Sequence, residues 1–94
     1  MKEQLIIPMY RLLSTKDIKD ISYDESDVFF FKRDYSLEER IKQFESLEWA
    51  MENPNYDFKS ISPIFSKVKF SNVEIFAYLK KIHQFMKVNY LDKE

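Results

Sequence analysis

The stretch that decides the fold spans residues 36–55, SLEERIKQFESLEWAMENPN. Ser36 and Glu39 have the spacing of a capping box, in which the hydroxyl and the carboxylate cover free backbone amides at a helix start. Five apolar residues then recur at intervals of three and four, the period of one helical face. They are Leu37, Ile41, Phe44, Leu47 and Met51. The pattern ends at Asn53-Pro54, because the residue before a proline disfavours the helical conformation. The stretch therefore predicts a helix over residues 37–52.

A second helix is predicted over residues 72–90. Ser71 and Glu74 repeat the capping-box spacing. The apolar stripe that follows is wide, which is typical of a helix that packs against more than one neighbour. Its members are Ile75, Phe76, Tyr78, Leu79, Ile82, Phe85, Met86 and Tyr90. Between the two helices, residues 56–65 are expected to form one or two helical turns that end at Pro63 and are followed by a loop. The apolar residues of this segment are expected to close one end of the core; they are Phe58, Ile61, Ile64 and Phe65.

The first third of the chain has no such clear period. Residues 5–7 fit either a short strand or the start of a helix entered at Pro8, and residues 24–27 are expected to form an acidic loop. Residues 28–31, Val-Phe-Phe-Phe, have high strand propensity and predict a strand or an extended segment between helices. The predicted fold class is mainly α, a single-domain bundle of three to five helices over residues 1–94. The alternative is an α+β fold with one short strand pair from the N-terminal third.

The composition excludes several classes of site. The chain has no cysteine, which rules out disulfides and thiolate metal sites, and it has one histidine, His83. It has no glycine either, so neither the dinucleotide-binding fingerprint nor the phosphate-binding loop can form. We therefore expect no metal and no cofactor. No apolar run approaches the roughly 18 residues of a membrane helix, and no signal peptide is evident, so we expect a cytoplasmic protein with no membrane partner.

Trp49 is the residue that most favours a binding function. On a helical wheel it points away from the apolar stripe of helix 37–52 and into a group of charged residues. That group is Glu38, Lys42, Glu45 and Glu52. Aromatic side chains are enriched at protein interfaces, and residues 36–57 carry six acidic and two basic side chains. The sequence therefore predicts a partner protein with a basic surface. The alternative for Trp49 is burial beneath residues 29–31.

The predicted function is accordingly that of a small, non-catalytic protein-binding module. Immunity proteins, antitoxins and phage-encoded inhibitors are small proteins of this character, and they act by occluding a surface of their partner. The analogy is one of class and depends on no sequence motif. Self-association through the same face, giving a homo-oligomer, is a further hypothesis.

Two other functions remain as alternatives. The first is a nucleic-acid-associated regulator that contacts phosphates through a C-terminal lysine ridge, although the net charge of −1 counts against it. The ridge comprises Lys67, Lys69, Lys80, Lys81 and Lys87. The second is a small enzyme, because Glu48 and His83 fall within the apolar stripes of the two predicted helices. A carboxylate beside an imidazole can serve acid–base catalysis, but a buried structural pair explains the same pattern, so we expect no catalytic site.

Overall fold

The computed structural model describes residues 2–93, apart from the side chain of Asp20, and every regular element in that part of the chain is helical. The α-helices are α1 (Ile6–Met9), α2 (Glu25–Asp34), α3 (Leu37–Glu52) and α4 (Asn72–Val88). The 3-10 helices, each of about one turn, are η1 (Lys2–Leu5), η2 (Tyr10–Leu13), η3 (Ile18–Asp20), η4 (Phe58–Ile61) and η5 (Pro63–Phe65). The predicted mainly-α fold class is confirmed. The strand pair of the alternative does not occur in residues 2–93.

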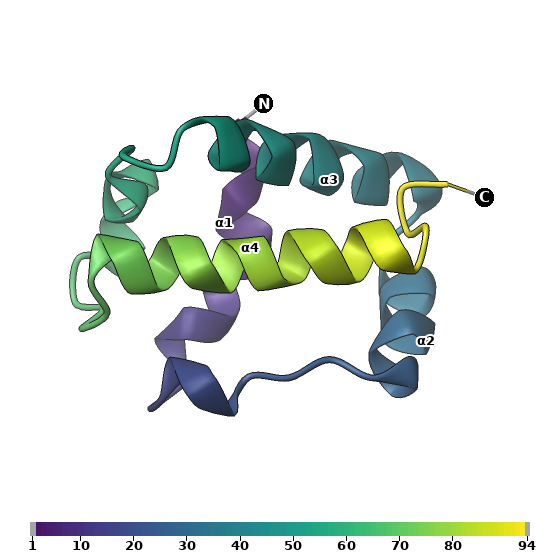
Figure 1. The fold of residues 1–94 in the computed structure, drawn as a ribbon, viewed down its shortest axis with the longest axis horizontal. Coiled ribbons are helices and arrows are strands. Elements are labelled where there is room, and N and C mark those ends of the chain that lie inside the picture. The colour runs from purple at the N-terminus through teal and green to yellow at the C-terminus, as the bar shows by residue number, and fades with distance from the viewer. Residues whose placement is uncertain (1, 94) are drawn as a thin grey trace.

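The two predicted long helices, α3 and α4, lie side by side and antiparallel at the centre of the molecule (Figure 1). Both predicted capping boxes form. Ser36 Oγ accepts from the Glu39 amide at 3.2 Å, and the Glu39 carboxylate accepts from the Ser36 amide at 3.0 Å. Ser71 and Glu74 make the same pair of bonds at 3.2 and 3.0 Å. The predicted bounds of α3 are confirmed, whereas α4 ends at Val88, two residues before its predicted end.

α4 ends in a C-terminal cap in which a residue other than glycine takes the left-handed position. Tyr90 adopts a left-handed conformation, with φ of 53°. The Leu91 amide donates to the Met86 carbonyl at 3.0 Å, and the Tyr90 amide donates to the Lys87 carbonyl at 3.3 Å. These two bonds define a Schellman motif, in which glycine usually takes the left-handed position. Tyr90 is consequently 67% exposed and does not continue the apolar stripe, and Leu91 takes the buried place instead.

The N-terminal elements η1, α1 and η2 form one continuous helical rod over residues 2–13, which crosses behind α3 and α4 (Figure 1). Pro8 lies inside this rod. Because proline has no amide hydrogen, it interrupts the α-helical ladder, and 3-10 turns flank it on both sides. Leu5, Met9 and Leu12 are buried against the central helices. The Tyr78 hydroxyl donates to the Pro8 carbonyl at 2.5 Å and ties the rod to α4.

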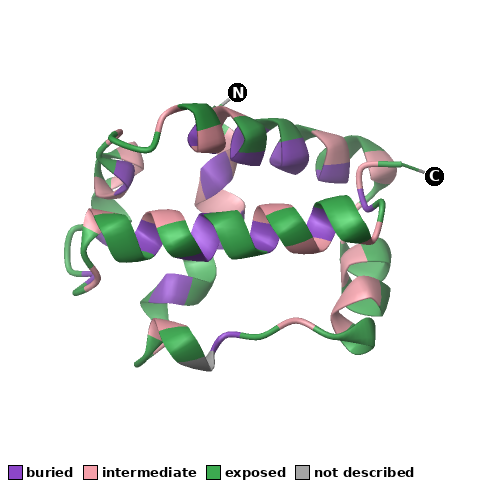
Figure 2. Ribbon diagram, viewed as in Figure 1, coloured by how far each residue is buried: buried purple, intermediate pink, exposed green. Residues whose placement is uncertain are grey.

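The prediction of a strand or extended segment over residues 28–31 is wrong, because these residues lie inside α2. The expected acidic loop is the start of that helix. The Asp24 carboxylate accepts from the Asp27 amide, and the Asp27 carboxylate accepts from the Asp24 amide at 2.8 Å, so the two aspartates form a capping box. This local cap outweighs the strand propensity of the phenylalanines. None of the residues of α2 is buried (Figure 2), and Phe29 is 62% exposed.

The core lies between the rod, α3 and α4, and the loop between the two long helices closes one end of it. Phe58 and Phe65 from that loop are fully buried, as expected. The predicted turn is η4, which ends at Ile61, two residues before Pro63. Pro63 begins a further turn, η5, where a loop was expected, and Ile64 is exposed instead of closing the core. The radius of gyration is 12.6 Å, close to the value of about 12 Å expected for a compact domain of this length. Among residues 2–93, no helix is long and apolar enough to cross a membrane.

Candidate partner-binding face

The charged side of α3 contains a shallow concavity beside Trp49. Glu45, Glu48, Trp49 and Glu52 line this concavity, which has a volume of about 260 Å³. The four residues follow one another at intervals of three, one and three, so a single face of the helix presents them all. We refer to these four residues as the acidic face. Three carboxylates thus surround one indole ring.

Trp49 is half-buried, which differs from both sequence-based alternatives. It is not fully exposed, and residues 29–31 do not cover it. Tyr56 packs edge-on against the indole, with ring centroids 5.1 Å apart. The ammonium group of Lys2 lies 5.8 Å from the Trp49 ring and 5.2 Å from the Tyr56 ring, within the range of a cation–π interaction. Trp49 is therefore held in place by its neighbours while part of it borders the concavity.

The structure divides the predicted partner-binding residues into two groups. Glu45, Trp49 and Glu52 belong to the acidic face. Glu38 and Lys42 lie on the same side of α3 but nearer its start, where they form an exposed ion pair at 3.5 Å. A pair of this kind contributes at most about 1 kcal/mol to stability, so both groups can exchange partners at low cost. The positive charge of Lys42 is balanced within α3, and the acidic face remains strongly negative.

Glu48 and His83 lie close together, as the wheels suggested, without a hydrogen bond between them. The Glu48 carboxylate is 4.0 Å from Nε2 of His83, which is too long for a hydrogen bond. The imidazole stacks on Phe44 with ring centroids 5.0 Å apart, and its buried Nε2 has no hydrogen-bond partner among the described residues. Burial lowers the pKa of His83, although the charges of Glu48 and Asp92 oppose this shift. The catalytic hypothesis therefore gains no positioned acid–base pair.

Glu48 was expected within the apolar stripe of α3, but its side chain is 56% exposed. The buried side of α3 is rotated away from the predicted stripe, because η1 packs against the helix beside α4. This rotation buries three polar residues that sequence reasoning missed, Arg40, Gln43 and Ser46. Arg40 donates to the carbonyls of Tyr35 at 3.2 Å and Leu91 at 2.9 Å. A helical wheel of α3 could have indicated that Arg40 is buried, since it falls between Phe44 and Leu47. No sequence pattern predicted that η1 packs against α3.

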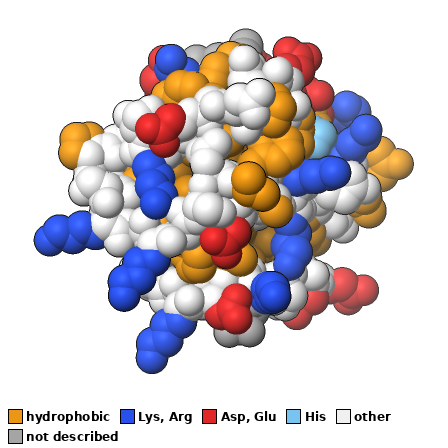
Figure 3. All heavy atoms as spheres, turned by 60° about the vertical axis from the view of Figure 1, so that its left-hand side comes forward, with side chains coloured by type: hydrophobic (Ala, Val, Ile, Leu, Met, Phe, Trp, Pro, Cys, Tyr) orange, Lys and Arg blue, Asp and Glu red, His pale blue; other side chains and the backbone are white. Residues whose placement is uncertain are grey.

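All five lysines of the predicted ridge are exposed, but they do not act as a single surface. Lys67 and Lys69 border a groove of about 460 Å³ near the N-terminal rod, together with Lys16. Lys81 instead donates to the Ile21 carbonyl at 2.6 Å and fixes the segment before α2. Basic side chains on this side of the molecule are scattered, with acidic and apolar groups between them (Figure 3). The ridge is therefore discontinuous.

No group of three or more acidic or histidine side chains within the described part of the chain is placed to hold a metal ion. Comparisons of the chain with protein-family models, with curated proteins and with solved structures give no match. The geometry and chemistry of the surface itself therefore provide the basis for a proposed function.

Proposed function

We propose that the protein is a small, non-catalytic binding module whose acidic face docks on a basic surface of another protein. The observation that carries this proposal is the concavity in which Glu45, Glu48 and Glu52 surround Trp49. A lysine or arginine side chain of the partner would enter this hollow, where the carboxylates supply charge and the indole supplies a cation–π surface.

Two features of the face favour this use. Tyr56 and Lys2 restrain the indole, so little side-chain entropy is lost when a partner binds. The position of Lys2 also demonstrates within this molecule that an ammonium group pairs with the rings of Trp49 and Tyr56. The partner would be occluded by the docked module, in the manner of an immunity protein, an antitoxin or a phage inhibitor. A cytoplasmic location, consistent with the absence of cysteine, is part of this proposal.

The experiment uses the whole chain to capture partners from a cell lysate and measures the affinity of any captured protein. Trp49→Ala should weaken binding by at least thirtyfold, since a tryptophan at the centre of an interface typically contributes 2 kcal/mol or more. Glu45→Gln with Glu52→Gln should slow association at low salt. The matched control is Glu25→Gln with Asp57→Asn, which removes the same charge from exposed positions elsewhere. Equal losses in the two double variants would contradict the proposal.

The mass of the protein in solution separates partner binding from self-association. A dimer whose formation is abolished by Trp49→Ala would assign the acidic face to contact with a second copy of the chain. A monomer that binds only in the presence of an intact acidic face would support a different partner.

Nucleic-acid binding remains a second candidate on one observation, the groove bordered by Lys16, Lys67 and Lys69. Phosphate contacts release counterions, so the logarithm of the affinity for DNA or RNA falls linearly with the logarithm of the salt concentration. The affinity should therefore fall steeply as salt increases from about 50 to 200 mM. Lys67→Gln with Lys69→Gln should reduce both the affinity and the slope. Absence of binding at low salt would end this candidate.

A further inference from the structure

A groove of about 460 Å³ lies between the end of the N-terminal rod and the segment that leads into α4. Two stretches of the chain line it, within residues 12–16 and 67–70. Each stretch supplies both lysine and apolar side chains, so charge and apolar surface occur together. We refer to it as the lysine groove. It shares no residue with the acidic face.

The two stretches are held in place by contacts within the molecule. The Tyr10 ring packs on the buried Phe65 ring, with centroids 6.4 Å apart, and this contact ties the rod to η5. The Val68 amide donates to the Phe65 carbonyl at 3.1 Å, and the Thr15 hydroxyl donates to the Arg11 carbonyl at 2.6 Å. A groove that is already formed loses little conformational entropy when it is occupied.

The charge of the lysine groove is entirely positive. Lys16, Lys67 and Lys69 are exposed, and no described residue that lines the groove carries a carboxylate. None of the three ammonium groups forms an ion pair with another residue in the described part of the chain. Asp17 is adjacent in sequence, but its carboxylate accepts from the Lys19 amide at 3.0 Å and caps η3. The groove therefore favours an anionic occupant.

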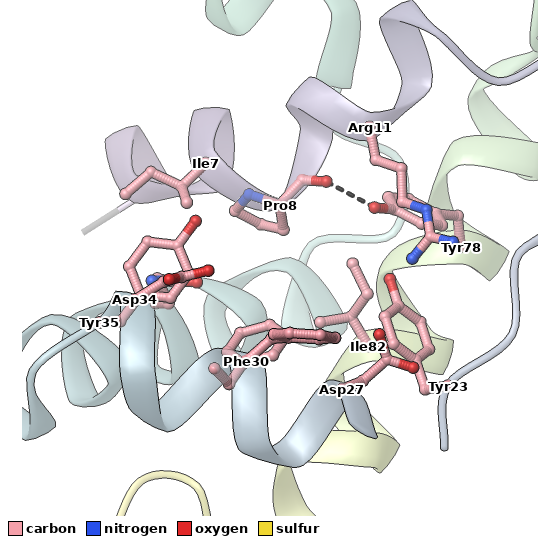
Figure 4. A pocket seen from close by; sticks show the side chains of 12 residues that line it. Ile7, Pro8, Arg11, Tyr23, Asp27, Phe30, Asp34, Tyr35, Tyr78 and Ile82 are labelled. Atoms are coloured by element: carbon pink, nitrogen blue, oxygen red, sulfur yellow. Dashed lines mark hydrogen bonds between the residues drawn. The ribbon is translucent and has the colours of Figure 1, made fainter. Parts of the chain in front are cut away.

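The hollow between the N-terminal rod and α2 differs from the groove in this respect (Figure 4). It is smaller, about 190 Å³, and Arg11 lines it together with Asp27 and Asp34. Because groups of both signs are present there, its lining does not specify the charge of a ligand. The lysine groove has charges of one sign and so does specify it.

The apolar part of the lysine groove is mainly aliphatic. Leu12 and Val68 are buried, whereas Leu13 is 48% exposed beside the lysines. Phe70 is the single aromatic residue among the described residues of the lining, and it is half-buried. Single-stranded nucleic acids bind through bases stacked on exposed aromatic rings, which this groove does not offer. Leucine, isoleucine or valine side chains of a protein fit an aliphatic surface better.

The size of the groove and the number of its charges separate a peptide from a fatty acid. A cavity of about 150 Å³ accommodates benzene, so about 460 Å³ has room for two or three side chains. A fatty acid brings a single carboxylate, which cannot pair with lysines on both stretches of the chain. A peptide in which acidic and aliphatic residues alternate supplies several carboxylates and apolar groups between them.

We propose that the lysine groove binds a short acidic segment of a partner protein, one that carries aliphatic side chains between its carboxylates. The carboxylates pair with Lys16, Lys67 and Lys69, and an aliphatic side chain packs on Leu13. The protein thus has two docking surfaces of opposite charge, and this one does not depend on the proposed function of the acidic face.

Three capped peptides of equal length test the proposal on the whole protein at pH 7. They alternate glutamate with leucine, glutamate with serine, and lysine with leucine. Binding is followed by the amide chemical shifts of residues 12–16 and 67–70. The glutamate–leucine peptide should bind with a Kd of about 1 mM or lower. The glutamate–serine peptide should bind at least tenfold more weakly, because it has no leucine to bury. The lysine–leucine peptide should give no saturable shift.

Other occupants are tested in the same assay. Tighter binding of a short oligothymidylate or of decanoate than of the glutamate–leucine peptide would overturn the proposal, in favour of a nucleic acid or a fatty acid. Equal affinity for the two glutamate peptides would also contradict it. The mass of the free protein in solution tests a second copy of the chain: a dimer that dissociates in Lys67→Gln with Lys69→Gln would replace the peptide as the occupant.

Substitutions in the groove locate the charge and the apolar contact separately. Lys67→Gln with Lys69→Gln should weaken binding of the glutamate–leucine peptide at least tenfold. Lys80→Gln with Lys87→Gln is the matched control, since it removes the same charge from exposed lysines that do not line the groove. Equal losses in the two double variants would assign binding to net charge alone and overturn the site.

Leu13→Ser tests the apolar contact with little risk to folding, because the side chain is exposed. It should weaken the glutamate–leucine peptide severalfold and leave the glutamate–serine peptide unchanged. Ile64→Ser is its control: this residue is exposed to a similar extent, also lies in a 3-10 helix and does not line the groove. Trp49→Ala should leave peptide binding unchanged, so failure of the acidic face and failure of the groove are distinguishable. Unchanged peptide affinity in Leu13→Ser would refute the apolar contact and with it the proposed segment.

Discussion

The pair formed by α3 and α4 and the single helix α2 begin in the same way, but they are held in place differently. All three helices start with a capping box. The pair buries residues along its full length, among them Leu47 and Leu79, whereas α2 buries none. A helix of ten residues is too short to be stable alone, so α2 depends on a few surface contacts such as that of Phe31 with Phe85 at 5.8 Å. A cap thus decides where a helix begins, and burial decides how firmly it is held.

Substitutions in α4 and in α2 should differ most in their effect on the free energy of unfolding when a core residue is removed. Leu79→Ala removes a fully buried side chain of α4 and should lower the free energy of unfolding by about 2–5 kcal/mol. Phe29→Ala removes a larger but exposed side chain of α2 and should change it by less than about 0.5 kcal/mol. Urea unfolding followed by circular dichroism measures both. Similar losses in the two variants would mean that α2 is part of the cooperative core.

Removal of the helix caps should sharpen the same contrast. Ser71→Ala deletes the cap of α4 and should lower the global free energy of unfolding by about 1 kcal/mol. Asp24→Ala deletes the cap of α2, so it should leave the global value nearly unchanged and accelerate amide hydrogen exchange within residues 25–34. Native-state hydrogen exchange by NMR distinguishes these outcomes. If the amides of α2 exchange only through global unfolding, local opening of this helix is excluded.

The contrast between the regions also explains which parts of the fold were predictable. The bounds of α3 follow from Ser36, Glu39 and Pro54, because caps and proline act within a few residues of themselves. In α2 two local signals disagreed. The strand propensity of residues 28–31 was visible, but an Asp–Asp capping box is a weaker sequence signature than one built from serine and glutamate.

The features that depend on distant contacts could not be derived from the sequence. Nothing near Glu48 in the sequence specifies that η1 packs beside α3 and leaves this residue exposed. The same packing buries Gln43. By contrast, the grouping of Glu45, Trp49 and Glu52 was predictable, since it requires only the geometry of one helix. Their role in binding a partner stays a prediction.

A substitution of Tyr90, the left-handed residue at the end of α4, should increase stability, whereas the core and cap substitutions above decrease it. Tyr90→Gly should raise the free energy of unfolding by up to about 1 kcal/mol, because glycine adopts positive φ without the steric cost that a Cβ imposes. Tyr90→Ala keeps the Cβ and serves as the control, with a change near zero. Both are measured by urea unfolding. A loss of stability in Tyr90→Gly would indicate that the exposed tyrosine ring makes a stabilising contact.

The smallest expected effect concerns His83, the ionisable group packed between α3 and α4. Burial lowers its folded-state pKa below the ordinary value of about 6.5, Lys87 adds to this shift, and Glu48 and Asp92 oppose it. The unfolded chain therefore takes up a proton at higher pH than the folded chain does, so this group makes stability fall as the pH decreases below about 6.5. His83→Gln should lose this part of the pH dependence when wild type and variant are compared by urea unfolding between pH 5.5 and 7.5.

Glu48→Gln tests whether the charge of Glu48 affects the pKa of His83. Since the Glu48 charge raises the pKa of His83, its removal should lower that pKa further, as measured by NMR titration of the imidazole protons. Glu25→Gln, which removes a charge from α2, should leave the titration unchanged. A His83 pKa above 6.5 in the wild type would show that the carboxylate dominates over burial, and the pair at 4.0 Å would then be an ion pair that strengthens the contact of α3 with α4 as the pH falls. A pKa below 6.5 that drops again in Glu48→Gln would establish that burial outweighs the attraction of the carboxylate, so that the contact of α3 with α4 disfavours the protonated histidine.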